Sequence, residues 1–172
     1  TGAGSINGIL ARLPRAEPDL PEPLNPEETA GPLEILWPLP QPSRTAVLGE
    51  PVKECARVRS FPGPDAPGLE NWPPDALAGR VETLCRLARE RPASLSLSHC
   101  VIALITLRGL FLTAEVRELL WSAWRVPVFG QILGLSRELL AWECEAHEGY
   151  HFDPGRVVFE PDRRSCEPEL LV

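Results

Sequence analysis

Proline is the residue that most constrains how this chain can fold, because fifteen of its 20 prolines fall within residues 1–74. Each proline removes a backbone N–H donor and pushes the preceding residue toward extended geometry. From Pro14 to Pro42 a proline recurs every few residues, and a second cluster runs from Pro62 to Pro74. The sequence therefore predicts an extended, polyproline-like arm over residues 1–74, in which helices and central strands are not expected.

Two parts of this arm carry apolar residues. Residues 47–59 contain fewer helix and strand breakers and are predicted to hold one short strand, best placed at Ala56 to Ser60. A second apolar stretch lies nearer the N-terminus and is predicted to lie as an extended strap over an apolar groove. Its apolar residues are Leu33, Ile35, Leu36, Trp37 and Leu39.

The pattern changes after Pro74, where helical periodicity begins. Asp75 is a suitable N-cap for a helix from about Ala76 to Glu90, which Arg91-Pro92 would end. The apolar residues at helical spacing are Leu77, Val81, Leu84, Leu87 and Ala88. Residues 97–107 are rich in aliphatic and β-branched side chains, which predicts a strand buried on both faces.

Predicted helices and strands continue to alternate toward the C-terminus. Thr113 is predicted to cap a second helix, and a second apolar strand is expected over residues 126–133. Two further short strands are expected at 140–145 and 156–160. These elements predict an α/β fold with a small, mostly parallel sheet, two packed helices and a C-terminal β-hairpin. The expected division is an arm over residues 1–74 and an α/β domain over residues 75–172.

Composition excludes several classes of partner. The formal net charge is −7, so neither nucleic acid nor an anionic membrane surface is expected to bind. No apolar run reaches the ~18 residues that a membrane span requires, and no secretory signal is visible. The five cysteines are irregularly spaced without a CxxC pair, which is typical of free thiols in a reducing compartment. The sequence therefore predicts a cytoplasmic protein.

The second half of the chain contains several short sequence motifs in a specific order. They are Leu112-Thr-Ala-Glu-Val-Arg-Glu-Leu-Leu, Pro127-Val-Phe, Gly134, Glu143-Cys-Glu-Ala-His-Glu-Gly-Tyr-His and Val157-Val-Phe-Glu160. Over about residues 76–160 this order resembles the phenylacetate–CoA ligase family of adenylate-forming enzymes. The resemblance implies a piece of the large domain of an acyl-CoA synthetase.

The sequence departs from that family where ATP would be used. Arg108-Gly109-Leu110 stands where the family has a Gly-Gly-Glu turn, and Leu133 and Arg137 stand where it has a tyrosine and a glutamate for adenine and magnesium. The family's phosphate loop and catalytic lysine have no counterpart. Because single transition-state donors are commonly worth ~3–4 kcal/mol, the family's activity is not expected and no catalytic residue is assigned. Gly134 and Arg137 remain candidate ligand-binding residues, since Arg137 could attract a phosphate.

A histidine-rich string provides a candidate metal site. Cys144, His147 and His151 have a Cys-x2-His-x3-His spacing that could direct three ligands to one zinc ion, with Cys166 or Cys100 as the fourth. The alternative is that these residues only shape a turn. Zinc is the one cofactor that the sequence suggests.

Two other groups of polar residues are expected to have structural roles. His99 and Cys100 are adjacent on an expected strand, so their side chains should point to opposite faces and should not pair. Glu143, Glu145 and Glu148 are expected on a solvated edge rather than as an acid–base pair.

Three hypotheses for function follow from these observations. The first is a non-catalytic relative of the ligases that acts as an interaction or small-ligand-binding module. The second is a structural zinc-binding protein, and the third is a subunit that completes an acyl-CoA ligase in trans. A partial domain exposes apolar surface, so a protein partner or a second copy of the chain is also expected.

Overall fold

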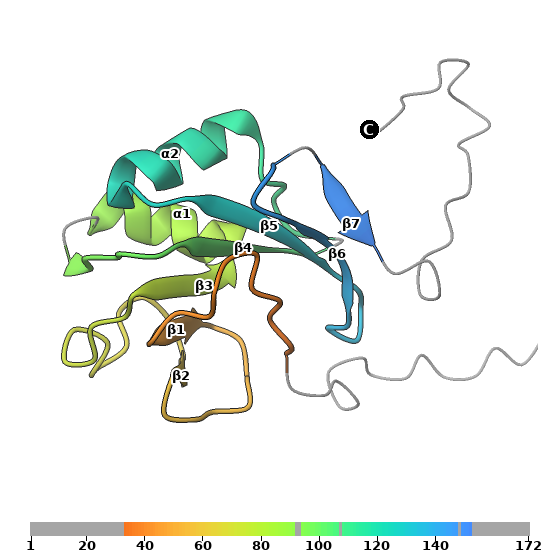
Figure 1. Ribbon diagram of the computed structural model, residues 1–172. Coiled ribbons are helices and arrows are strands. Elements are labelled where there is room, and N and C mark those ends of the chain that lie inside the picture. The colour runs from red at the N-terminus through yellow and green to blue at the C-terminus, as the bar shows by residue number, and fades with distance from the viewer. Residues whose placement is uncertain (1–32, 92–93, 107, 148, 153–172) are drawn as a thin grey trace, which may run out of the picture.

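The computed structural model describes residues 33–91, 94–106, 108–147 and 149–152, which form one α/β unit around a seven-stranded sheet (Figure 1). The strand order is β2-β1-β3-β4-β5-β6-β7. Strands β2, β1, β3, β4 and β5 are parallel, whereas β6 and β7 are antiparallel additions at one side. The bounds are Thr45–Leu48 (β1), Val58–Phe61 (β2), Ala76–Arg80 (β3), Val101–Thr106 (β4), Val128–Leu133 (β5), Leu139–Glu143 (β6) and Tyr150–Phe152 (β7). The predicted mostly parallel sheet with a C-terminal hairpin is therefore confirmed.

Two helices cover one face of the sheet (Figure 1). Helix α1 (Val81–Glu90) connects β3 to β4, and helix α2 (Ala114–Trp124) connects β4 to β5. The predicted cap of α2 is confirmed, since the Thr113 side chain accepts a hydrogen bond from the Val116 amide at 3.4 Å. The helices pack on every second residue of the central strands, including Val101, Ala103 and Ile105.

The alternate residues of those strands face the other side, and the predicted strap covers them. Leu33, Ile35, Trp37 and Leu39 belong to a second apolar cluster with buried strand residues such as Ile102, Leu104 and Phe129. Two polar contacts hold the backbone of this strap in place. The Leu33 amide donates to the Pro51 carbonyl at 3.2 Å, and Gln131 Nε2 donates to the Leu36 carbonyl. The strap prediction is confirmed for Leu33, Ile35, Trp37 and Leu39, whereas Leu36 is exposed and is not part of the cluster.

The expected helix start at Ala76 is wrong, because Ala76–Arg80 forms β3 in the middle of the sheet. Its first four residues are buried between β1 and β4, and this pairing prevails over the helical propensity of alanine and leucine. The Asp75 side chain does not cap a helix. It accepts hydrogen bonds from the Arg44 amide at 3.0 Å and the Ser98 hydroxyl at 3.3 Å, and so joins the segments that enter β1 and β4.

The proline-rich half contributes more to the sheet than its composition suggests. The single strand expected near Ala56 to Ser60 is present as β2, and a second strand, β1, precedes it. Both pair in parallel, β1 directly with β3, so the sheet crosses the expected boundary at residue 74.

The C-terminal elements also differ from the expected ones. Strands β4 and β5 are parallel neighbours as predicted, and β6 corresponds to the strand expected over residues 140–145. Strand β7 lies in the segment expected to be a turn, while residues 156–160 lie outside the described part of the chain. Neither described helix is long and apolar enough to cross a bilayer.

Candidate anion-binding cleft

The parallel strands β1, β3, β4 and β5 all end at the same edge of the sheet, which is where open α/β sheets usually bind ligands. A hollow of about 200 Å³ lies at this edge. Its lining comes from the ends of these four strands and the turns that follow them. The residues are Glu50, Arg80, Thr106, Arg108, Leu133, Gly134, Leu135 and Arg137, and we refer to the hollow as the arginine cleft.

Each side chain reaches the cleft because its strand ends there. Glu50 follows β1 by two residues, after Gly49 turns the chain with a φ of 73°. Arg80 and Thr106 are the last residues of β3 and β4. Arg137 lies in the turn between β5 and β6 with a φ of 66°, a left-handed conformation that is uncommon for arginine. The cleft is thus a product of the parallel topology.

Glu50 is the buried centre of the arrangement. Its side chain is 1% exposed, and its Oε1 accepts a hydrogen bond from Arg80 Nε. Its Oε2 lies 3.5 Å from Arg137 Nε and accepts no hydrogen bond from the described residues. The Ser60 hydroxyl donates to the Glu50 carbonyl at 2.7 Å and fixes the backbone. One buried carboxylate therefore holds guanidinium groups from two different segments.

Arginines outnumber carboxylates among the residues that line the cleft. Three arginines but a single carboxylate line it. Arg108 is exposed and has no hydrogen bond or ion pair with any part of the chain that the structure describes. The carboxylates of Glu82 and Glu138 lie nearby, but they accept hydrogen bonds from the amides of Leu110 and Ser136. Guanidinium groups with unused donors are suited to carboxylate or phosphate.

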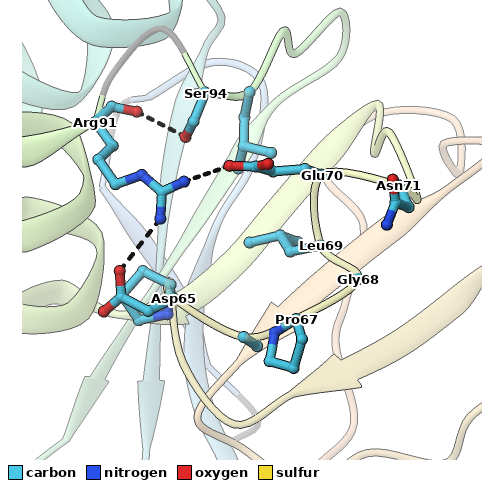
Figure 2. A pocket seen from close by; sticks show the side chains of 11 residues that line it. Asp65, Pro67, Gly68, Leu69, Glu70, Asn71, Arg91 and Ser94 are labelled. Atoms are coloured by element: carbon cyan, nitrogen blue, oxygen red, sulfur yellow. Dashed lines mark hydrogen bonds and ion pairs between the residues drawn. The ribbon is translucent and has the colours of Figure 1, made fainter.

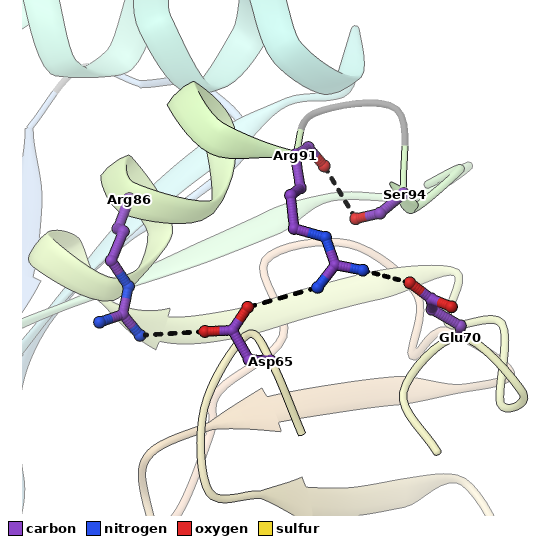
Figure 3. A network of polar contacts seen from close by, with 5 residues as sticks. All are labelled: Asp65, Glu70, Arg86, Arg91 and Ser94. Carbon is purple, nitrogen blue, oxygen red and sulfur yellow. Dashed lines mark hydrogen bonds and ion pairs between the residues drawn. The ribbon is translucent and has the colours of Figure 1, made fainter. Parts of the chain in front are cut away.

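A second hollow, beside helix α1, has a different electrostatic character. It is lined by the loop from Pro64 to Asn71 together with Arg91, Ser94 and Leu95 (Figure 2). Arg91 contacts both Asp65, at 3.3 Å, and Glu70 (Figure 3). Arg86 lies 4.0 Å from the other oxygen of Asp65. Two arginines and two carboxylates thus compensate one another, and the cluster ties the loop to the C-terminal end of the helix.

The structure brings together both ligand-binding residues that the sequence suggested, because Gly134 and Arg137 line the arginine cleft. The sequence did not indicate that Glu50, Arg80, Thr106 and Arg108 lie in this cleft. Glu50 and Arg80 were missed because β1 was not predicted and β3 was assigned to a helix. All four are polar residues that stand at or just after the end of a buried parallel strand. This shared feature can be recognised only when the strands have been assigned correctly.

Three of the candidate zinc ligands, Cys144, His147 and His151, lie in or next to the turn between β6 and β7. The His147 ring stacks on Phe129 with a centroid distance of 4.5 Å, and the His151 ring lies against Trp142 at 6.1 Å. Cys144 is half-buried, and Cys166 lies outside the described residues. Within the described ranges, no three Cys, His, Asp or Glu side chains are grouped as metal ligands. The zinc site stays a prediction.

Two expectations about polar residues are wrong. His99 Nδ1 lies 3.1 Å from Cys100 Sγ, because His99 precedes β4 and is not bound to the alternation of a strand. Burial raises the pKa of the Cys100 thiol to about 12, so it is not a nucleophile at neutral pH. The expected solvated edge is wrong for Glu143, which is buried and accepts hydrogen bonds from Arg117 Nη2 at 2.7 Å and the Gly130 amide at 2.6 Å. Glu145 is exposed as expected, and Glu148 lies outside the described residues.

Comparison of the chain with protein-family models and with curated proteins finds no match.

Proposed function

We propose that this protein is a non-catalytic relative of the phenylacetate–CoA ligase-like, adenylate-forming enzymes and binds a small anionic ligand in the arginine cleft. The observation that carries the proposal is the convergence of Arg80, Arg108 and Arg137 at the carboxyl edge of the sheet, around one buried carboxylate. Arg80 is already oriented by its hydrogen bond to Glu50, so little of its side-chain entropy is lost when a ligand binds.

The charge of the cleft also supports the absence of adenylation. By the resemblance, Arg137 takes the place of a glutamate that would hold magnesium. Three guanidinium groups attract an anion but repel a divalent cation, so they favour a free anion over a metal–nucleotide complex. We expect that Mg²⁺ does not strengthen binding of ATP, and that the chain does not exchange pyrophosphate into ATP in the presence of phenylacetate.

Binding of inorganic phosphate, measured by isothermal titration calorimetry, tests the cleft. Arg108→Gln and Arg137→Gln should each weaken phosphate binding roughly 10-fold or more, since a hydrogen bond to a charged group contributes about 1.5–3 kcal/mol. The matched control is Arg89→Gln, which makes the same charge change on an exposed residue near the C-terminal end of α1. Equal weakening by the control, or no phosphate binding by the unmodified chain, would contradict the proposal.

A partner chain at the same edge is a second candidate, favoured by exposed apolar side chains. Leu110, Phe111 and Leu135 are 53%, 66% and 62% exposed, and they lie on the connections that follow β4 and β5. Large apolar side chains grouped on an exposed edge are typical of a protein interface.

Light scattering after size-exclusion chromatography tests this second candidate. We expect the unmodified chain to associate with itself, and a Phe111→Ser, Leu135→Ser double variant to be monomeric at the same concentration. Leu36→Ser, which removes an exposed leucine elsewhere, is the matched control and should leave the association unchanged. A monomeric unmodified chain would remove the case for a homo-oligomer.

A further inference from the structure

One carboxylate oxygen in the arginine cleft, Glu50 Oε2, lacks a hydrogen-bond donor in the described part of the chain, and binding of an anion does not supply one. Glu50 Oε2 is buried and accepts no hydrogen bond from the described residues. Arg137 Nε is 3.5 Å away from it, which is longer than the usual 2.7–3.2 Å of an N–H···O hydrogen bond. Leaving a buried acceptor without a donor destabilises a folded protein, because the acceptor has lost its hydrogen bonds to water. An orphaned carboxylate oxygen at a ligand site therefore indicates a donor that the ligand supplies.

The chemistry of the cleft restricts what this donor can be. Glu50 already contacts two guanidinium groups, those of Arg80 and Arg137, so an ammonium group beside Oε2 would meet two positive charges and only one negative charge, which disfavours it. A metal ion is disfavoured for the same reason, and Glu50 is the one carboxylate among the residues that line the cleft. A neutral hydroxyl remains as the donor that suits Glu50 Oε2 best.

The guanidinium groups also restrict the anionic part of the ligand. The three guanidinium groups of the lining suit a phosphate monoester, which carries about −1.5 to −2 charges at pH 7 and three acceptor oxygens for their N–H donors. The hollow of about 200 Å³ is smaller than the roughly 300–1,000 Å³ of sites that enclose a drug-sized ligand. It therefore fits a phosphate with a short carbon chain, or that end of a larger molecule.

Resting on the proposed function, we infer that the arginine cleft selects a hydroxylated phosphate monoester. Arg108 and Arg137 hold the phosphate, and Glu50 Oε2 accepts a hydrogen bond from a hydroxyl close to it. The guanidinium of Arg137 lies over Glu50 in the structure. When the phosphate draws this guanidinium outward, Oε2 becomes accessible to the hydroxyl. Glu50 is thus a specificity-determining residue, while the arginines provide the attraction.

Two phosphate monoesters of similar size distinguish the role of Glu50 in specificity from the role of the arginines in attraction. Glycerol 3-phosphate carries hydroxyl groups beside its phosphate, and n-propyl phosphate has the same chain length and charge without them. By calorimetry on the full chain we expect glycerol 3-phosphate to bind about 10-fold tighter or more, because a hydrogen bond to a charged group contributes ~1.5–3 kcal/mol. Glu50→Leu should abolish this preference, whereas Arg108→Gln should weaken both ligands by a similar factor.

The outcomes distinguish the inference from the proposed function. If neither ester binds, the anion-binding function itself fails. If both bind equally, or if the Glu50 variant keeps the preference, the function stands and the role of Glu50 is overturned. Should Glu50→Leu not fold, the ¹³C shift of the Glu50 carboxylate in the unmodified chain decides the matter. It should move further with glycerol 3-phosphate than with n-propyl phosphate, because both esters displace Arg137 but only the first adds a hydrogen bond, and an equal response to both would contradict the inference. Ribose 5-phosphate and AMP, titrated in parallel, show whether the hydroxylated ester is free or part of a nucleotide.

Discussion

Replacing Glu143 with alanine is expected to lower the free energy of unfolding by about 3 kcal/mol, at the low end of the cost of breaking a buried ion pair. The carboxylate joins three elements, since it lies on β6 and accepts hydrogen bonds from Arg117 of α2 and from the Gly130 amide of β5. Arg117 Nη1 also donates to the Val128 carbonyl. Alanine would leave the Gly130 amide without its acceptor and the half-buried Arg117 without its counter-charge.

Urea denaturation followed by tryptophan fluorescence measures this effect, with the midpoint and the slope fitted separately. The matched control is Glu145→Ala, which removes an exposed carboxylate two residues further along the same segment. The control should change stability by less than about 0.5 kcal/mol, as is usual for surface positions. A similar loss for both variants would show that net charge, rather than the Arg117–Glu143 contact, is responsible.

Much of the fold could be predicted where the information is local. The Thr113 cap and the apolar stripe that ends at Trp124 predict α2, because capping and 3.6-residue periodicity act within one element. Residues 101–106 form a buried strand whose composition alone excludes an exposed position. The secondary structure of these elements can be predicted from their own residues, without knowledge of the elements that pack against them.

Strand β3 could not be predicted in the same way. Its sequence, Ala76–Arg80, consists largely of good helix formers, and it runs directly into α1 without a break. What makes it a strand is pairing with β1 on one side and β4 on the other. Such long-range pairing leaves no periodic trace when a segment is buried on both faces.

The candidate site was only partly predictable for the same reason. Gly134 and Arg137 could be proposed because the family resemblance aligns this part of the sequence with a ligand-binding motif, and both residues follow a recognisable strand. The contact between Glu50 and Arg80 joins residues 30 positions apart, and it depends on two strands that the sequence did not reveal. A binding site at the carboxyl edge of a parallel sheet is a property of the strand order, so it follows from the fold rather than from any local motif.

Replacing both Leu33 and Trp37 with serine is expected to destabilise the protein by about 4 kcal/mol, since a buried apolar side chain contributes ~1.5–3 kcal/mol. Parallel sheets need cover on both faces, and these residues are part of the strap that packs against the face opposite the helices. Leu33 is 5% exposed, and Trp37 packs on the same cluster as Phe129. Without them, strand residues such as Ile102 and Leu104 would lose part of their cover.

The strap contains its own control, because Leu36 points away from that cluster and is 40% exposed. Its contribution is the backbone carbonyl that accepts a hydrogen bond from Gln131 Nε2, which Leu36→Ser preserves. Urea midpoints should therefore fall strongly for the Leu33, Trp37 double variant and remain nearly unchanged for Leu36→Ser. Binding of a hydrophobic dye should rise only in the double variant as the second face becomes accessible. Equal stability of the double variant and the unmodified chain would mean that residues 33–39 rest on the sheet without stabilising it, and that the cover of this face comes from elsewhere.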